Sequence, residues 1–159
     1  MDFALPPEIE DYRSRIRTFV ETHIIPLEAD RANYDEHENI RSDVLEGVRA
    51  KVKDAGLWAL QMPKDRGGQG LNVAGITPCY EEMNRSIFGP VCFNCAAPDD
   101  GNMTVLNKVA TDAQKERWLQ PIIDGKVRSS FAMTEPAPGS GSDPSAMMTT
   151  AEKKGDTWV

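Results

Sequence analysis

The sequence predicts a mainly α-helical fold with a short β segment near its carboxyl end. Apolar side chains recur at steps of three and four residues in the first two thirds of the chain, as is typical of helices that bury one face. Proline and glycine separate these stretches into several helices. From Arg128 onward, short apolar runs alternate with turns, a pattern that favours strands.

The first helix is predicted from one apolar stripe. Pro6 and Pro7 suit its start, where a missing amide hydrogen costs little, and Pro26 should end or kink it. The stripe consists of Ile9, Tyr12, Ile16, Phe19, Val20 and Ile24.

Two further helices are expected over residues 42–55 and 73–87. Ser42 can cap the first of them, and Gly56 follows it in the position that favours a left-handed backbone. Pro78 falls in the first turns of the second.

A loop and two helices are predicted next. Residues 94–102 have the composition of a loop, and residues 103–110 suggest a short helix. Thr111 and Gln114 form the T-x-x-Q pattern of a capping box, which opens a helix that Gly125 closes.

The carboxyl-terminal segment is expected to contain three short strands, over residues 129–134, 148–151 and 157–159. Three short strands with open edges are marginal by themselves. We therefore expect a helical N-terminal domain over residues 1–126 and the beginning of a second, β domain over residues 127–159, so that the sequence stops inside that domain.

Composition excludes several classes of protein. A net charge of −7 argues against nucleic-acid binding, which needs clustered Lys and Arg. No apolar run approaches the length of about 18 residues that a membrane span requires. The acidic, proline-interrupted N-terminus is unlike a targeting peptide. We expect a soluble protein in the cytoplasm.

The three cysteines, an odd number, argue against a disulfide framework. Cys92 and Cys95 form a CxxC pair, which suits a redox centre or half of a zinc site. His23 and His37 lie far upstream, so we interpret Cys79, Cys92 and Cys95 as reduced thiols in a packed segment and expect no metal site.

A glycine cluster at residues 66–70 begins like a dinucleotide fingerprint, with Gly68-x-Gly70. Val73 stands where a third small residue belongs, and no strand precedes the cluster. We interpret it as a tight turn between helices.

Residues 131–143, FAMTEPAPGSGSD, are the best candidate for a functional site. Bare amides and serine hydroxyls in such a loop can bind phosphate oxygens, and a hydroxyl beside it can bind the edge of a flat heterocycle. A flexible surface loop is an equally open alternative.

Other candidates have weaker support. Glu135 lies beside this loop as a possible base, but a carboxylate before a proline is more often a surface group. Asp99 and Asp100 lack the further ligands that a metal needs. Met133, Met147 and Met148 suit an acyl pocket or, by default, core packing.

Several motifs together resemble those of the acyl-CoA dehydrogenases, FAD-dependent flavoproteins that desaturate fatty acyl-CoA thioesters. They are LQMP at 60–63, GGQGL at 67–71, QKxxWLxP at 114–121, FAMTEP at 131–136, GSD at 141–143 and GDxWV at 155–159. Residues 94–103, NCAAPDDGNM, resemble the branch that contains the vertebrate long-chain members ten and eleven and their bacterial relatives.

The resemblance implies a helical N-terminal domain, a middle β-barrel domain and a C-terminal four-helix domain, usually in a homo-oligomer. It implies FAD as the cofactor, acyl-CoA as the substrate and electron-transferring flavoprotein as the electron acceptor. In this family a glutamate removes the α-proton while the β-hydrogen passes as hydride to the flavin. The helical lobe would line the acyl-chain side, with residues 96–103 near it.

Carried over to this chain, the resemblance places the ring of Phe131 beside the isoalloxazine. Met133 and Thr134 would supply backbone and hydroxyl hydrogen bonds to its pyrimidine edge. The family's catalytic glutamate and its flavin-contacting Trp-x-Thr strand would follow residue 159. The resemblance therefore assigns no catalytic residue here and implies that these residues alone have no dehydrogenase activity.

Ser142 corresponds to the family's serine before an aspartate, which contacts the FAD phosphate or the thioester part of the substrate. The chain has six residues between Pro136 and Asp143 where the common pattern has four, so Ser140 and Ser142 compete for both contacts. Two alternatives remain: a module that binds flavin or acyl thioester without catalysis, and a helical partner of a separate catalytic chain.

Overall fold

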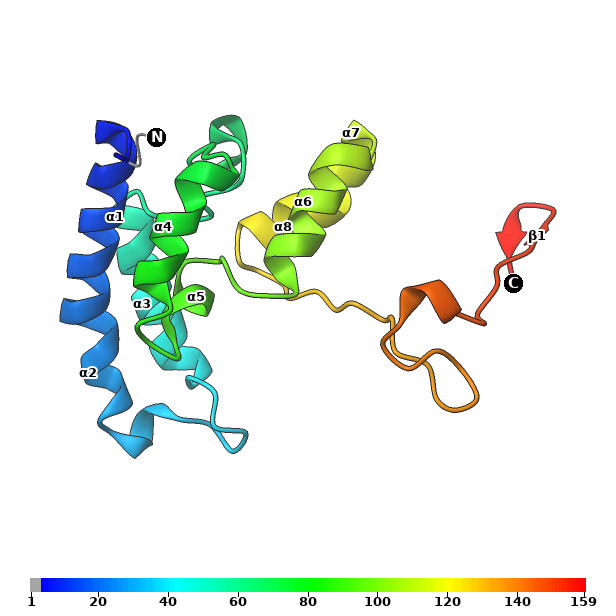
Figure 1. The fold of residues 1–159 in the computed structure, drawn as a ribbon, viewed down its shortest axis with the longest axis horizontal. Coiled ribbons are helices and arrows are strands. Elements are labelled where there is room, and N and C mark those ends of the chain that lie inside the picture. The colour runs from blue at the N-terminus through cyan, green and yellow to red at the C-terminus, as the bar shows by residue number, and fades with distance from the viewer. Residues whose placement is uncertain (1–3) are drawn as a thin grey trace. The chain divides into compact units, whose positions relative to one another are not determined.

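The computed structural model describes residues 4–159. The chain divides after Ser129 into two compact units, which are described separately. The first unit is helical and the second contains a short hairpin, so the mainly helical fold class is confirmed (Figure 1). No helix among residues 4–159 is long and apolar enough to span a membrane.

The first unit contains eight α-helices in its described part. They are α1 (Pro7–Phe19), α2 (Ile25–Glu28), α3 (Ser42–Asp54), α4 (Val73–Met83), α5 (Gly89–Cys92), α6 (Asp99–Val109), α7 (Asp112–Gln114) and α8 (Gln120–Ile123). Turns of π-helix join α1 to α2 and α7 to α8, over Val20–Ile24 and Lys115–Leu119. Turns of 3-10 helix lie at Arg31–Asn33 and Lys64–Arg66.

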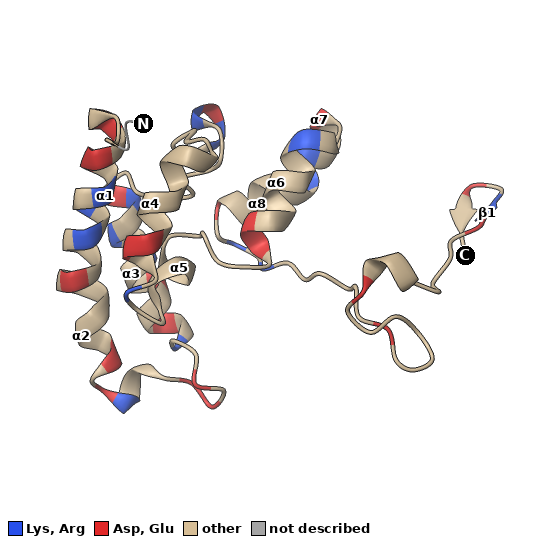
Figure 2. Cartoon of the chain, in the orientation of Figure 1, with Lys and Arg blue, Asp and Glu red and all other residues tan. Residues whose placement is uncertain are grey.

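The core of this unit forms where α1 packs along α4, with α3 and α5 beside them (Figure 1). The apolar stripe of the first helix points inward, since Ile16, Val20 and Ile24 are fully buried. The polar faces of these helices carry both signs of charge, and acidic and basic residues follow one another along α1 (Figure 2). One apolar face per helix therefore holds the unit together, as the periodicity predicts.

Pro26 and Pro121 lie inside continuous helices instead of ending them, and Pro78 lies inside α4. Pro26 was expected to end or kink the first helix, but the helix continues to Glu28 through a π turn. The amide of Ile25 donates to the carbonyl of Val20, five residues back. Because a proline ring clashes with the carbonyl four residues before it, the wider turn removes that conflict. The same arrangement precedes Pro121.

The start of α3 differs from the expectation, whereas its end agrees with it. Ser42 is the first helical residue and Arg41 takes the cap position, without a side-chain cap. Arg41 instead pairs with the carboxylate of Asp43 at 2.6 Å. At the other end Gly56 has φ +66° and its amide donates to the carbonyl of Lys53, which confirms its predicted role.

Helix α4 ends at Met83, although the sequence predicts a helix to Ile87. The chain turns back so tightly that a Cβ on Gly89 would lie 1.8 Å from the carbonyl oxygen of Met83. The carboxylate of Glu28 holds this turn, because it accepts hydrogen bonds from the Ser86 hydroxyl and from the Ile87 amide. The Ile87 amide thus donates to a side chain that is distant in the sequence and not to a carbonyl of its own helix.

Helix α6 begins at Asp99, so the expectation of a loop over residues 94–102 is wrong in its second half. Asp99 and Asp100 occupy the first turn, where negative charge stabilises a helix. The next helix begins as predicted, since Thr111 and Gln114 form a complete capping box. Gly125 ends it with φ +76°.

In the second unit the predicted strands 129–134 and 148–151 are not formed, because neither segment has a partner strand. The unit contains a hairpin of β1 (Lys153–Lys154) and β2 (Thr157–Trp158), which pair antiparallel across a turn at Gly155. A 3-10 turn lies at Pro144–Ala146, and an isolated bridge joins Glu135 to Gly141.

Candidate functional site

Glu135 organises the loop that the sequence singles out. Its carboxylate accepts hydrogen bonds from the amides of Ser140 (3.1 Å), Met148 (3.0 Å) and Thr149 (2.6 Å). The hydroxyls of Ser140 and Thr149 donate to the same carboxylate. The Glu135 side chain therefore joins the two ends of the segment 135–149 through hydrogen bonds.

These bonds argue against Glu135 as a general base. The Met148 amide, the Thr149 hydroxyl and the Ser140 amide all stabilise the ionised carboxylate, and they lower the pKa of Glu135 to about 2. A group with so low a pKa takes up a proton poorly near neutral pH. The interpretation that the sequence analysis favours, a surface carboxylate and not a base, fits this environment.

The donors near this loop differ in how far they are engaged. Ser140 uses both its amide and its hydroxyl on Glu135. Thr134 and Ser142 are exposed, and their hydroxyls have no hydrogen-bond partner among residues 4–159. The ring of Phe131 is 68% exposed, and Met133 is half-buried.

The loop therefore offers an exposed aromatic ring and two unengaged hydroxyls on a backbone fixed by Glu135. That donor set suits a flat ligand with carbonyl and phosphate oxygens. The structure does not form the anion-binding loop of the sequence prediction at Ser140, because Glu135 already binds that amide.

The cysteines are buried and unpaired, which agrees with their interpretation as packed thiols. Burial raises the pKa of Cys79 to about 11 and the pKa values of Cys92 and Cys95 to about 12. Within residues 4–159, no group of three or more His, Cys, Asp or Glu side chains is arranged to hold a metal ion.

The glycine cluster is a turn, as the sequence analysis favours. Gly67 and Gly70 have φ +95° and +70°, which suits residues without a Cβ. A Cβ on Gly68 would lie 2.1 Å from the carbonyl oxygen of Met62, so the close approach of the backbone requires glycine at position 68. A 3-10 turn and not a strand precedes the cluster, contrary to a dinucleotide fold.

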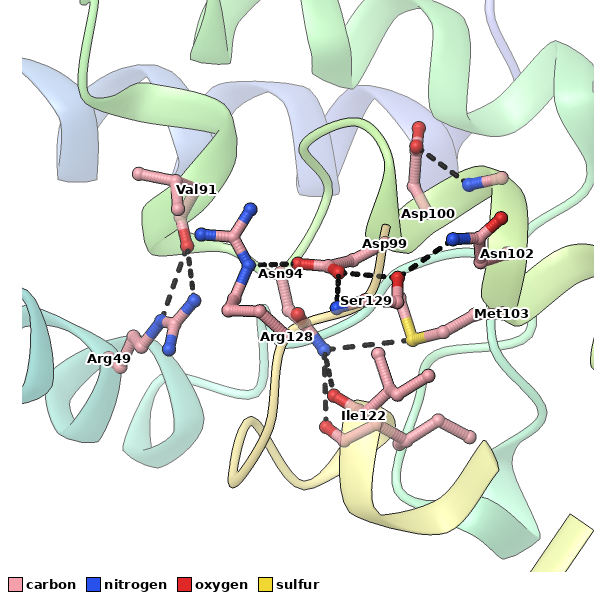
Figure 3. A network of polar contacts seen from close by, with 12 residues as sticks. Arg49, Val91, Asn94, Asp99, Asp100, Asn102, Met103, Ile122, Arg128 and Ser129 are labelled. Carbon is pink, nitrogen blue, oxygen red and sulfur yellow. Dashed lines mark hydrogen bonds and ion pairs between the residues drawn. The ribbon is translucent and has the colours of Figure 1, made fainter. Parts of the chain in front are cut away.

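Asp99 and Asp100 do not form a pair of ligands. Asp99 is 2% exposed and binds Arg128 and Ser129 (Figure 3). Asp100 accepts hydrogen bonds from the Gly101 amide and, at 3.5 Å, from the Tyr80 hydroxyl. Asp99 is therefore a buried, bonded carboxylate, and its partners are 29 and 30 residues away in the sequence.

Residues 96–103, which the resemblance places near the acyl chain, divide into two parts. Ala96 and Ala97 line two surface pockets of about 430 and 460 Å³ on the helical unit. Met103 is fully buried, and its sulfur accepts a hydrogen bond from Asn94 at 3.8 Å. The two alanines, unlike Met103, therefore line a surface that a ligand can reach.

The family described as acyl-CoA dehydrogenase, N-terminal domain, matches residues 6–126. The chain therefore belongs to the acyl-CoA dehydrogenase family and corresponds to the N-terminal part of its proteins.

Individual relatives agree with this assignment. The chain is 38% identical to the probable acyl-CoA dehydrogenase FadE2 of Mycobacterium tuberculosis over 100% of the chain and 39% of that protein. It is 37% identical to acyl-CoA dehydrogenase family member 11 of Gallus gallus over 91% of the chain and 19% of that protein. The resemblance to the branch of members ten and eleven is thus confirmed.

Solved structures confirm the fold. A candidate acyl-CoA dehydrogenase from Mycobacterium abscessus matches with a TM-score of 0.82 and 37% identity, over 97% of this chain and 40% of that one. Butyryl-CoA dehydrogenase from Megasphaera elsdenii matches with a TM-score of 0.67 and 25% identity, over 98% and 39%. The chain spans about two fifths of the length of both proteins.

Proposed function

We propose that this chain is the N-terminal part of an FAD-dependent acyl-CoA dehydrogenase that introduces the α,β double bond of an acyl-CoA thioester. Family membership supports the enzyme class. The proposal that the chain binds FAD rests on two hydroxyls without a hydrogen-bond partner among residues 4–159, those of Thr134 and Ser142. They lie on the loop that Glu135 fixes.

In this proposal the residues of the second unit bind and orient the flavin. The Thr134 hydroxyl and the Met133 backbone hold the pyrimidine edge, and the Phe131 ring covers one part of the isoalloxazine and excludes water. When bound, FAD supplies the acceptor for the hydrogen that leaves the β-carbon. Ser142 binds the FAD phosphate or the thioester part of the substrate.

The structure favours Ser142 over Ser140 for this last contact. Both groups of Ser140 that can donate are directed to Glu135, and rotating the hydroxyl away would give up one of that carboxylate's bonds. Ser142 has no such bond to lose. The six-residue spacing between Pro136 and Asp143 thus leaves one serine for the loop and one for a ligand.

The helical unit would provide the acyl-chain side, where Ala96 and Ala97 border the surface pockets. Electron-transferring flavoprotein is the proposed acceptor, the cytoplasm the proposed location and a homo-oligomer the proposed assembly. One solved structure with 27% identity to this chain bears the name of an electron-transferring flavoprotein, from Acidaminococcus fermentans.

The test compares Ser142→Ala with Ser140→Ala in the enzyme expressed from the complete reading frame. Ser142→Ala is expected to weaken FAD or acyl-CoA binding about tenfold, as for a lost hydrogen bond to a charged or polarised group. Ser140→Ala should have a smaller effect. Flavin content, FAD titration and steady-state kinetics provide the readouts.

Thr134→Val tests the ring contact separately, because it removes the hydroxyl and keeps the shape of the side chain. Full flavin content and activity in both Thr134→Val and Ser142→Ala would reject the assigned site. Absence of bound flavin and of dehydrogenation in the wild-type enzyme would reject the proposed function itself.

A further inference from the structure

The last residues of the helical unit are held by one buried carboxylate. Asp99, in the first turn of α6, accepts hydrogen bonds from the Ser129 amide and the Ser129 hydroxyl, each at 2.7 Å. The guanidinium of Arg128 pairs with its other oxygen. The side-chain amide of Asn102, one turn along α6, donates to the Ser129 hydroxyl at 2.9 Å (Figure 3).

This contact is costly to build, which argues for a specific role. Asp99 is 2% exposed, so its charge has lost its water and depends on these donors. Both oxygens are used on residues 128 and 129. An aspartate that served only the helix terminus would need neither burial nor a partner on a distant segment.

A second buried polar side chain secures the segment from which Ser129 comes. The side-chain amide of Asn94 donates to the backbone carbonyls of Ile122 and Ile123 at 3.0 and 3.2 Å, and so binds the end of α8. Asn94 and Asp99 both belong to the 94–103 motif. The motif therefore holds the chain at the end of α8 and again at Ser129, six residues later.

Ser129 is also where the helical unit ends, since the second unit begins at residue 130. Phe131, the first residue of the proposed flavin site, follows Ser129 by two residues. Within residues 129–134 no strand pairing fixes the backbone. The bonds to Asp99 therefore fix the backbone two residues before the segment that contains Phe131, Met133 and Thr134.

We infer that Asp99 is a positioning residue for the flavin site: its carboxylate anchors Ser129 and so fixes the point at which the segment containing residues 131–134 begins. The inference rests on the proposed function, because the site it positions is the proposed one. A variant without this anchor still has every proposed contact side chain. Its FAD affinity is lower, because the segment must be ordered when FAD binds.

The test uses Asp99→Asn in the enzyme from the complete reading frame, with Asp100→Asn as the matched control. Both variants remove a carboxylate from the first turn of α6, but only the first loses the ion pair with Arg128. We expect FAD to bind Asp99→Asn about tenfold more weakly, with no such change in Asp100→Asn. Faster amide hydrogen exchange confined to residues 129–134 is the second expected result.

Ser129→Ala provides an independent variant in case Asp99→Asn does not fold. It removes the hydroxyl that Asp99 and Asn102 share and keeps the ion pair with Arg128. It should also weaken FAD binding and accelerate exchange in residues 129–134. FAD affinity equal to wild type in the folded variants would overturn the inference.

Two other results would contradict the inference in distinguishable ways. Faster exchange over all of α6 and α8, with flavin loss only in proportion to a lowered Tm, would make Asp99 a residue of general stability. A wild-type enzyme that binds no FAD would reject the proposed function together with this inference. Normal flavin binding by wild type and by Asp99→Asn would reject the inference alone.

Discussion

Glu82 shows at the residue scale how the helical unit uses buried charge. Its carboxylate is 2% exposed and lies between the guanidiniums of Arg13, Arg17 and Arg85. The bonds from Arg17, at 2.5 and 2.9 Å, are the main cause that lowers the pKa of Glu82. The contact joins α4 to α1 across the main helix pair of the core.

Replacing Glu82 with glutamine should destabilise the unit by about 2 kcal/mol. The value lies below that for a fully buried pair, because the three arginines keep access to water. Urea denaturation followed by circular dichroism measures it. Glu81→Gln is the matched control, since Glu81 is exposed on the same helix. Equal stability of the two variants would show that the buried bonds contribute nothing.

Glu135 leads to a prediction about pH. The pKa of Glu135 is lowered from 4.5 to about 2. The stabilisation that its hydrogen bonds contribute is therefore fully present above about pH 4.5. It should be lost as the pH falls toward 2. The Thr149 amide resonance, followed by NMR, should report a transition in this range. Glu135→Gln should abolish it, whereas a transition that persists would assign it to another group.

Individual side chains differ in how far the sequence predicts their environment. The cysteines could be assigned to the interior because their neighbours are apolar and potential metal ligands are distant. The burial of Asp99 could not, since its partners lie 29 and 30 residues away. Nor does local sequence show that Ser140 is engaged and Ser142 is not. A single useful signal was present: polar Asn94 stands between Phe93 and Cys95 in an apolar stretch.

At the scale of elements, the capping box at Thr111 gives a direct test. The Gln114 amide donates to the Thr111 hydroxyl at 3.3 Å, and the Gln114 side chain accepts from the Thr111 amide at 2.9 Å. Thr111→Ala should cost about 1 kcal/mol of the free energy of unfolding. Thr111→Ser, which keeps the hydroxyl, should cost much less. Thermal or urea denaturation distinguishes them, and equal losses would contradict the cap.

Helices were more predictable than strands for a physical reason. The signals for a helix, such as the capping box or Gly56 after α3, lie within one or two turns of the residue they affect. A strand needs a partner elsewhere. Residues 129–134 have the composition of a strand, but they form no strand in the structure. Of the predicted strands only residues 157–159 correspond to a strand, β2, and its partner β1 lies just across one turn.

At the scale of the whole molecule, we expect these 159 residues alone to catalyse no dehydrogenation of acyl-CoA. The proposed site contains two carboxylates, and hydrogen bonds lower the pKa of both: Met148, Thr149 and Ser140 donate to Glu135, and Ser145 donates to Asp143. Rapid-mixing measurements of flavin reduction with short, medium and long acyl-CoA test this, with the enzyme from the complete reading frame as the positive control. Flavin reduction by the 159 residues would contradict it.

The π turns before Pro26 and Pro121 make two helices sensitive to the number of residues they contain. Each residue of an α-helix advances the helix by about 100°. Removing one residue from Val20–Ile24 would bring the ring of Pro26 against a carbonyl and rotate all side chains beyond it onto another face. Substitution of an exposed residue such as Thr22 leaves that count unchanged. Gain or loss of a single residue should therefore be rarer at these two places than exchange of one residue for another.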